Sequence, residues 1–141
     1  MTIRHQFFPE NKLFVQKYSG DWSVDDYAGF VYQQFEEKKI EGLVKVFTDL
    51  RSVTNLVEAF KSLTKLQEIR KTFLSENFLN VQLVDKPSST AIIHLYQEGL
   101  SENNKYYYCS TVIQALKILQ LSESISEIEM EDRLMNLKFQ Y

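Results

Sequence analysis

The chain has 141 residues, of which 44% are hydrophobic and 25% charged, with a formal net charge of −3 and a single cysteine. This size and composition are typical of one globular domain and exclude an intrinsically disordered chain, because disorder needs low hydrophobicity and high net charge. The acidic balance argues against nucleic-acid binding, which needs clustered cations, and one cysteine excludes an intrachain disulfide.

The first residues predict a β-hairpin. Residues 3–8 and 12–19 are rich in β-branched and aromatic side chains, and a turn sequence lies between them. The first strand should end at Pro9, because proline has no N–H to donate to a sheet.

A helix over about 24–38 should follow the hairpin. Ser23 precedes it and Asp26 stands three residues later, a pair that resembles a capping box, and apolar side chains then recur at helical spacing. Residues 43–50 give the strongest strand pattern in the chain. They are apolar on both faces, as is typical of an interior strand covered by helices.

A second helix over about 55–76 should begin at a capping box formed by Asn55 and Glu58. Its apolar residues recur mostly at steps of three, so we expect it to bend or to divide into two helices near Ser62. A further strand should follow and end at Asp85.

Residues 87–89 should open a third helix. Its inward face should carry Ala91, Ile92, Leu95 and Tyr96. A polar loop over 99–105 then leads to a short strand at 106–108, and Thr111 with Gln114 should cap a fourth helix.

The last segment, 122–141, is predicted to be a C-terminal helical extension that begins at a capping box of Ser124 and Glu127. The element order β-β-α-β-α-β-α-β-α-α predicts an α/β fold with a mainly parallel sheet of about five strands. The sheet should start with the hairpin, which adds an antiparallel edge strand, and carry helices packed on it. We interpret 1–141 as a single domain.

The chain has no segment that predicts membrane insertion. No run approaches the roughly 18 apolar residues needed to cross a bilayer, and the N-terminus lacks the apolar stretch of a signal peptide. We therefore expect a cytoplasmic protein without an integral membrane segment.

Catalytic and metal-binding motifs are missing from the sequence. His5 and His94 have no second ligand at metal-like spacing, and no nucleophile elbow or phosphate-binding loop occurs. Cys109 precedes a helix, which can lower a thiol pKa, but no histidine pairs with it in the pattern, so a structural role is favoured. We expect no enzyme activity, cofactor or metal.

The segment 48–54 and the residue after it are the best candidates for a binding site. They lie at the carboxyl end of the best strand, where α/β sheets usually meet ligands and partners. The candidate residues are Asp49, Arg51, Ser52, Thr54 and Asn55. The structural alternative is a turn in which Asp49 accepts backbone N–H bonds, Arg51 pairs with a nearby acid, and a hydroxyl helps to cap the helix.

Aromatic residues gather around the first junction of strand and helix. They are Tyr18, Trp22, Tyr27 and Tyr32. Such residues are favoured at protein interfaces and are equally normal at a core boundary. In the run 106–108, at least one ring must face away from the others because strand side chains alternate, and on an edge strand that ring could support dimerisation.

Three segments resemble the SpoIIAA-like group of small bacterial proteins, relatives of the STAS domain of anti-sigma factor antagonists. The first is Ser19-Gly20 followed by 22–27 at the start of a helix, the second is 46–51, and the third is 110–116. The resemblance covers roughly 3–121. It implies an α/β layer fold and non-catalytic work through binding.

The phosphorylation switch of true anti-sigma factor antagonists is an Asp-Ser-x-Gly segment, which the chain lacks. The corresponding stretch begins at Asp49 and continues Leu-Arg-Ser-Val-Thr-Asn. We therefore do not transfer a phosphoserine to this chain. Some relatives are proposed to bind lipids or other apolar ligands, although no single residue here carries that inference.

The leading hypothesis is a STAS-like regulatory module that binds an unidentified protein partner near 49–56 and forms a homodimer. The alternative is a carrier of a small apolar ligand or lipid, held between the sheet and the helix at 88–98.

Overall fold

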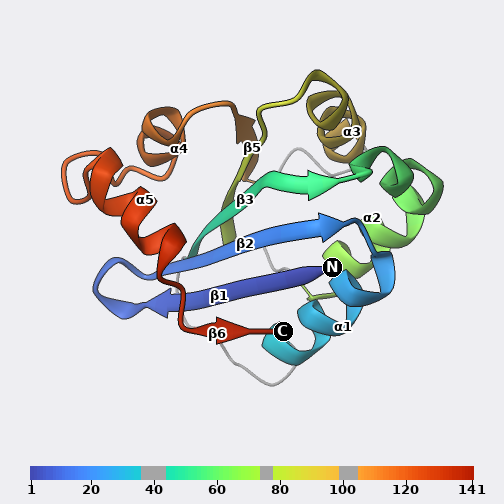
Figure 1. Ribbon diagram of the computed structural model, residues 1–141, viewed down its shortest axis with the longest axis horizontal. Helices are drawn as coiled ribbons and strands as arrows, with labels where there is room; N and C mark the ends of the chain where they lie inside the picture. Colours follow the sequence, from blue (N-terminus) through green and yellow to red (C-terminus); the bar gives the residue numbers. More distant parts are fainter. Residues whose placement is uncertain (36–43, 74–77, 99–104) are drawn as a thin grey trace.

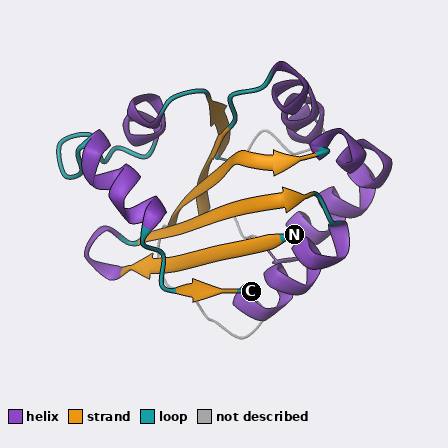
Figure 2. Ribbon diagram, viewed as in Figure 1, coloured by secondary structure: helices purple, strands orange, loops and turns teal. Residues whose placement is uncertain are grey.

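The computed structural model describes residues 1–35, 44–73, 78–98 and 105–141. The described chain forms an α/β fold in which one mixed sheet of six strands carries helices on both faces (Figure 1, Figure 2). The elements are β1 Thr2–Phe8, β2 Leu13–Asp21, α1 Val24–Phe35, β3 Val44–Thr54, α2 Leu63–Phe73, β4 Phe78–Leu83, α3 Pro87–Glu98, β5 Tyr106–Cys109, α4 Val112–Ile118, α5 Glu127–Met135 and β6 Phe139–Gln140. Two 3-10 helices, η1 Pro9–Asn11 and η2 Leu56–Ser62, complete the order.

The strand order is β5-β4-β3-β2-β1-β6. The predicted parallel part is confirmed, because β2, β3, β4 and β5 run parallel to one another, and the predicted hairpin is the antiparallel pair β1–β2. The sheet, expected to have about five strands, has six, and β1 is not its edge strand. The two residues of β6 pair with Arg4 and His5 on the outer side of β1.

The helices form in the predicted segments, but their first and last residues differ from the prediction. Ser23 accepts a hydrogen bond from the backbone N–H of Asp26, as the capping pattern indicates. The predicted helix at 55–76 divides into η2 and α2, which meet at Ser62 as expected. The predicted capping role of Asn55 is wrong, because Asn55 is left-handed with a φ of 54° and its side chain does not cap η2. The predicted helical residues 36–38 and 74–76, and the loop at 99–104, lie outside the described residues.

Each face of the sheet has its own apolar core. The first core lies between one face of the sheet and the helices α1, η2, α2 and α3, and it includes Phe30, Val46 and Ile92. The other packs on α4 and α5, and includes Phe47 and Met130. The C-terminal segment, expected to be an extension, is part of this second core. On α3 the predicted inward set is half right, because Ile92 and Tyr96 are buried whereas Ala91 and Leu95 are exposed.

Within the described residues, no helix has both the length and the apolar character needed to cross a membrane.

Candidate functional site

The segment that begins at Asp49 is part of a strand. The strand expected to end at residue 50 is longer, because β3 continues to Thr54 and pairs with β2 as far as Asp21, so no turn follows Asp49 directly. Between the pairs Lys17↔Asp49 and Ser19↔Ser52, β3 has one residue more than β2, which is a β-bulge. A bulge leaves backbone groups unpaired. Here the Asp49 carboxylate accepts the N–H of Arg51 at 3.0 Å.

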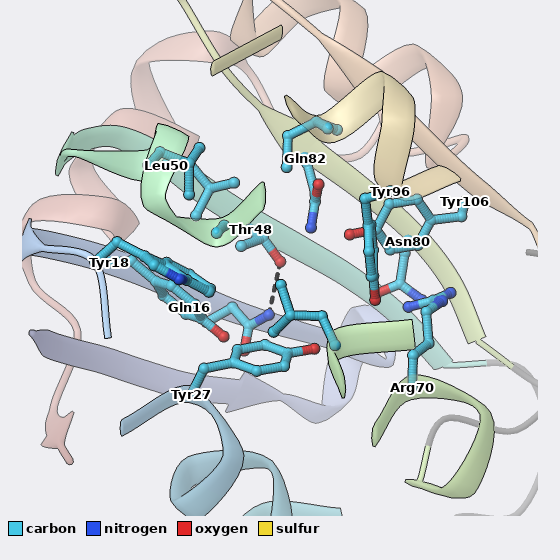
Figure 3. Close-up of a pocket in the computed structure, with 15 residues that line it drawn as sticks. Gln16, Tyr18, Tyr27, Thr48, Leu50, Arg70, Asn80, Gln82, Tyr96 and Tyr106 are labelled. Carbon is cyan, nitrogen blue, oxygen red and sulfur yellow. Dashed lines mark hydrogen bonds between the residues drawn. The ribbon is translucent and has the colours of Figure 1, made fainter. Parts of the chain in front are cut away.

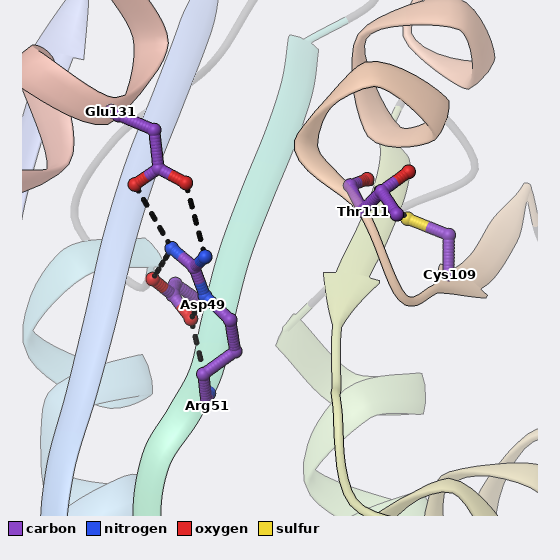
Figure 4. Close-up of polar contacts among 5 residues, drawn as sticks. All are labelled: Asp49, Arg51, Cys109, Thr111 and Glu131. Carbon is purple, nitrogen blue, oxygen red and sulfur yellow. Dashed lines mark hydrogen bonds and ion pairs between the residues drawn. The ribbon is translucent and has the colours of Figure 1, made fainter. Parts of the chain in front are cut away.

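Asp49 and Arg51 form an ion-pair cluster with Glu131 of α5 (Figure 4). The Arg51 guanidinium donates to both Asp49 oxygens at 3.0 and 2.8 Å and to both Glu131 oxygens at 3.0 and 3.1 Å. Hydrogen bonds to Asp49 and then Glu131 raise the pKa of Arg51 further above its usual range. Asp49 is only 1% exposed, so the cluster ties β3 to α5. This arrangement matches the structural alternative for these two residues.

The other three predicted binding residues lie elsewhere. Ser52, Thr54 and Asn55 are exposed. Thr54 and Asn55 donate hydrogen bonds to the carboxylate of Asp21 at the end of β2. The structure thus separates the ion pair of Asp49 and Arg51 from Thr54 and Asn55, which contact Asp21, and from the exposed Ser52. The role of all five residues in binding stays a prediction.

Cys109 and the two histidines have structural contacts. The Cys109 thiol donates to the Thr111 carbonyl at 3.4 Å, and partial burial raises its pKa, so the thiol stays protonated (Figure 4). His94 lies 3.2 Å from Glu98 on the surface of α3, and His5 packs among aromatic rings that include Phe30. Among the described residues, no three His, Cys, Asp or Glu side chains are grouped to hold a metal ion.

A cavity of about 50 Å³ lies on the first face of the sheet, beneath η2, α2 and α3 (Figure 3). Its floor comes from neighbouring strands and carries Gln16, Thr48, Asn80 and Gln82. Its walls carry a buried arginine and several aromatic residues: Arg70, Tyr18, Trp22, Tyr27, Tyr96 and Tyr106. Leu50 and residues of η2, α2 and α3 provide the apolar part.

Strand periodicity and register bring the polar floor together. Side chains alternate along a strand, so Gln16, Thr48 and Gln82 face the same side as the apolar residues of the first core. The register then sets Gln16 opposite Thr48, and Thr48 opposite Gln82. The Gln16 amide donates to the Thr48 hydroxyl at 2.6 Å. The result is a polar row across three strands of an otherwise apolar face.

Most of this polar surface lacks hydrogen-bond partners. Among the described residues, eight buried side-chain nitrogen or oxygen atoms have none, and all but Gln97 Nε2 belong to residues of the cavity. The other seven atoms are Gln16 Oε1, Tyr18 OH, Trp22 Nε1, Arg70 Nε, Asn80 Nδ2, Gln82 Oε1 and Tyr96 OH. Leaving a buried polar group unpaired costs about 1–3 kcal/mol, and native proteins contain few. Their concentration in one place therefore needs an explanation.

Arg70 supplies a buried positive charge. It is 3% exposed, and its guanidinium lies over the ring of Tyr106, 3.9 Å from the centroid. The ion pairs formed between described residues do not include Arg70. In Figure 3, its side chain reaches the cavity next to Asn80 and Tyr96.

The tyrosines around Arg70 are neutral. Burial raises the pKa of Tyr27, Tyr96 and Tyr106 above the usual value. Their hydroxyls therefore keep their protons at any physiological pH. They are hydrogen-bond donors and cannot serve as the counterion of the guanidinium.

Sequence reasoning found one side of this cavity and missed the floor. Tyr18, Trp22 and Tyr27 do cluster, with ring centroids 6.3 Å apart for Tyr18–Tyr27 and 5.8 Å for Trp22–Tyr27, whereas Tyr32 is exposed. The missed residues are Gln16, Arg70, Asn80 and Gln82. A signal was present, since three of them are polar residues at core-facing positions of apolar strands.

No protein-family model matches the chain, and the search of curated proteins found no match.

Proposed function

We propose that the protein is a non-catalytic binding module that holds a small polar molecule in the cavity between the sheet and η2, α2 and α3. The observation that carries this proposal is the group of seven unpartnered polar atoms at one cavity. A bound molecule with complementary donors and acceptors would satisfy them together.

The size and lining of the cavity limit what it can hold. About 50 Å³ corresponds to about three to five water molecules at 10–15 Å³ each, which suits a molecule of a few non-hydrogen atoms. An acyl chain does not fit this volume, and the polar floor argues against the apolar ligand or lipid. The described lining residues include no carboxylate, histidine or thiol, so we find no general base for catalysis there.

A protein partner remains a second candidate. It is favoured by η2, whose residues Leu56 and Ala59 line the cavity while Val57 and Phe60 are 54% and 57% exposed. Exposed apolar side chains of this kind are typical of interaction sites. In a STAS-like regulatory module, as the sequence resemblance implies, η2 would connect the occupied cavity to a docking surface. The homodimer also stays a proposal.

Thermal unfolding of a cavity-filling variant tests the polar-ligand proposal. Ala59 is buried in the cavity wall, so Ala59→Met should fill the space; Ala91→Met places the same side chain on the exposed face of α3 and is the control. The probes are acetamide, glycerol, methylammonium, lactate and lactamide.

We expect at least one probe to raise the Tm of the wild type and the Ala91→Met variant in a saturable way, with the effect lost in Ala59→Met. Equal Tm shifts in all three proteins, or no shift with any probe, would contradict the proposal.

A further inference from the structure

This inference rests on the proposed function and concerns the charge of the bound molecule. Arg70 places a guanidinium, a cationic group, in the wall of the cavity. Taking such a charge out of water is costly unless an opposite charge compensates it. Among the described residues, no ion pair supplies that compensation.

The immediate neighbours of Arg70 do not remove the charge either. The ring of Tyr106 gives a cation–π contact, and the hydroxyls of Tyr96 and Tyr106 are neutral. Water molecules in the cavity could accept hydrogen bonds from the guanidinium. Water cannot neutralise it, however, so hydration alone leaves the electrostatic cost in place.

The unpartnered atoms also favour an acceptor-rich molecule. Trp22 Nε1 and Arg70 Nε can only donate hydrogen bonds, whichever way nearby amides are oriented. The amide nitrogen of Asn80 and the hydroxyl of Tyr18 add further donors. The unpaired oxygens of Gln16 and Gln82 are acceptors, and the hydroxyls of Tyr18 and Tyr96 can donate or accept.

We propose that the cavity binds a small organic carboxylate, with its carboxylate group paired to Arg70. Figure 3 shows Arg70 beside Asn80 at one end of the cavity and Gln16 beside Tyr18 at the other. The planar carboxylate matches the fork of the guanidinium and accepts from Asn80 as well. A hydroxyl on the same molecule would donate to Gln16. The volume restricts the molecule to the size of lactate.

The test compares lactate with lactamide, which has the same shape without the charge. Isothermal titration calorimetry should show lactate binding about tenfold tighter than lactamide to the wild type, because hydrogen bonds to charged groups are the stronger ones. Arg70→Met should bind the two equally, and Arg70→Lys should keep a reduced preference. Lys71→Met removes an exposed charge one residue away on α2 and should keep the full preference.

The Tm of the unliganded variants gives a second readout. If Arg70 has no counterion in the protein, Arg70→Met should unfold at the same or a higher temperature than the wild type. A markedly lower Tm would mean that the protein itself compensates the charge, and would overturn the inference.

The outcomes separate this inference from the proposed function. If the wild type binds lactate and lactamide equally and Ala59→Met binds neither, the carboxylate inference is contradicted, whereas the proposal of a polar-ligand cavity is supported. Tighter binding of inorganic phosphate than of lactate would overturn the organic carboxylate in the same way. No binding of any of these probes would contradict both proposals.

Discussion

Arg51 and Arg70 differ in what faces their guanidinium groups. Arg51 donates to the carboxylates of Asp49 and Glu131, while Arg70 faces an aromatic ring and neutral hydroxyls. The first arrangement is an ion-pair cluster that joins two elements of the fold. The second is a buried charge for which the described residues provide no counterion.

The ion-pair cluster predicts an unequal response to mutation. Arg51→Met leaves the buried Asp49 carboxylate without its cation and should lower the free energy of unfolding by about 2–4 kcal/mol, allowing for the partial exposure of Arg51. Glu131→Gln removes a carboxylate that is 40% exposed and should cost less than about 1 kcal/mol. Urea unfolding measures both values. A cost for Glu131→Gln as large as that for Arg51→Met would contradict this division.

For individual residues, the sequence predicted contacts between residues that are close in the chain. The structural alternative for Asp49 and Arg51 anticipated both the backbone N–H bond and the pairing with an acid. Glu131 could not be identified, because it is 80 residues away and depends on where α5 packs.

The sequence predicted which segments form helices and strands better than it predicted the residues at which they begin and end. The start of α5 illustrates the reason. Both Ser124 with Glu127 and Ser126 with Glu129 fit the capping-box pattern, and the structure uses Ser126, whose hydroxyl accepts the N–H of Glu129. Burial of Ile125 in the second core decides between them, because it keeps the preceding residues in a turn.

This assignment gives a matched pair of variants. Ser126→Ala removes the cap of α5 and should cost about 1 kcal/mol of unfolding free energy. Ser124→Ala changes an exposed side chain outside the helix and should cost almost nothing. Chemical denaturation of the two variants checks the difference. A larger cost for Ser124→Ala would show that the helix begins two residues earlier.

Strand register explains why the cavity floor was harder to predict than the strands. Alternation within each strand shows which residues share a face, so Gln16, Thr48 and Gln82 could each be placed on a core-facing side. Their alignment into one row depends on the pairing of three strands, and that register comes from contacts between distant segments.

For the whole molecule, the alternation of strands and helices was enough to predict an α/β fold with a mainly parallel sheet. The sixth strand was missed because two residues are too few to show a period of two. It forms because the chain leaving α5 runs beside β1, where backbone groups are available for pairing. Long-range docking of this kind leaves no local pattern.

The cavity also has a consequence for the stability of the whole domain. Buried polar atoms without protein partners and a buried cation cost stability wherever water does not compensate them, and on the proposed function a bound molecule that satisfies them would recover that cost. The protein should therefore be markedly more stable when the cavity is occupied. Such a cost is typical of functional sites rather than of a core selected for packing.

Binding of a small polar molecule in the cavity can be followed directly through the one tryptophan of the chain. Trp22 lines the cavity, so the ¹⁵N-labelled protein has a single indole N–H signal at the site. Titration with lactate and with lactamide should move this signal in a saturable way in the wild type and leave it unmoved in Ala59→Met. An indole signal that neither compound moves in the wild type, at concentrations up to the solubility limit, would contradict the account.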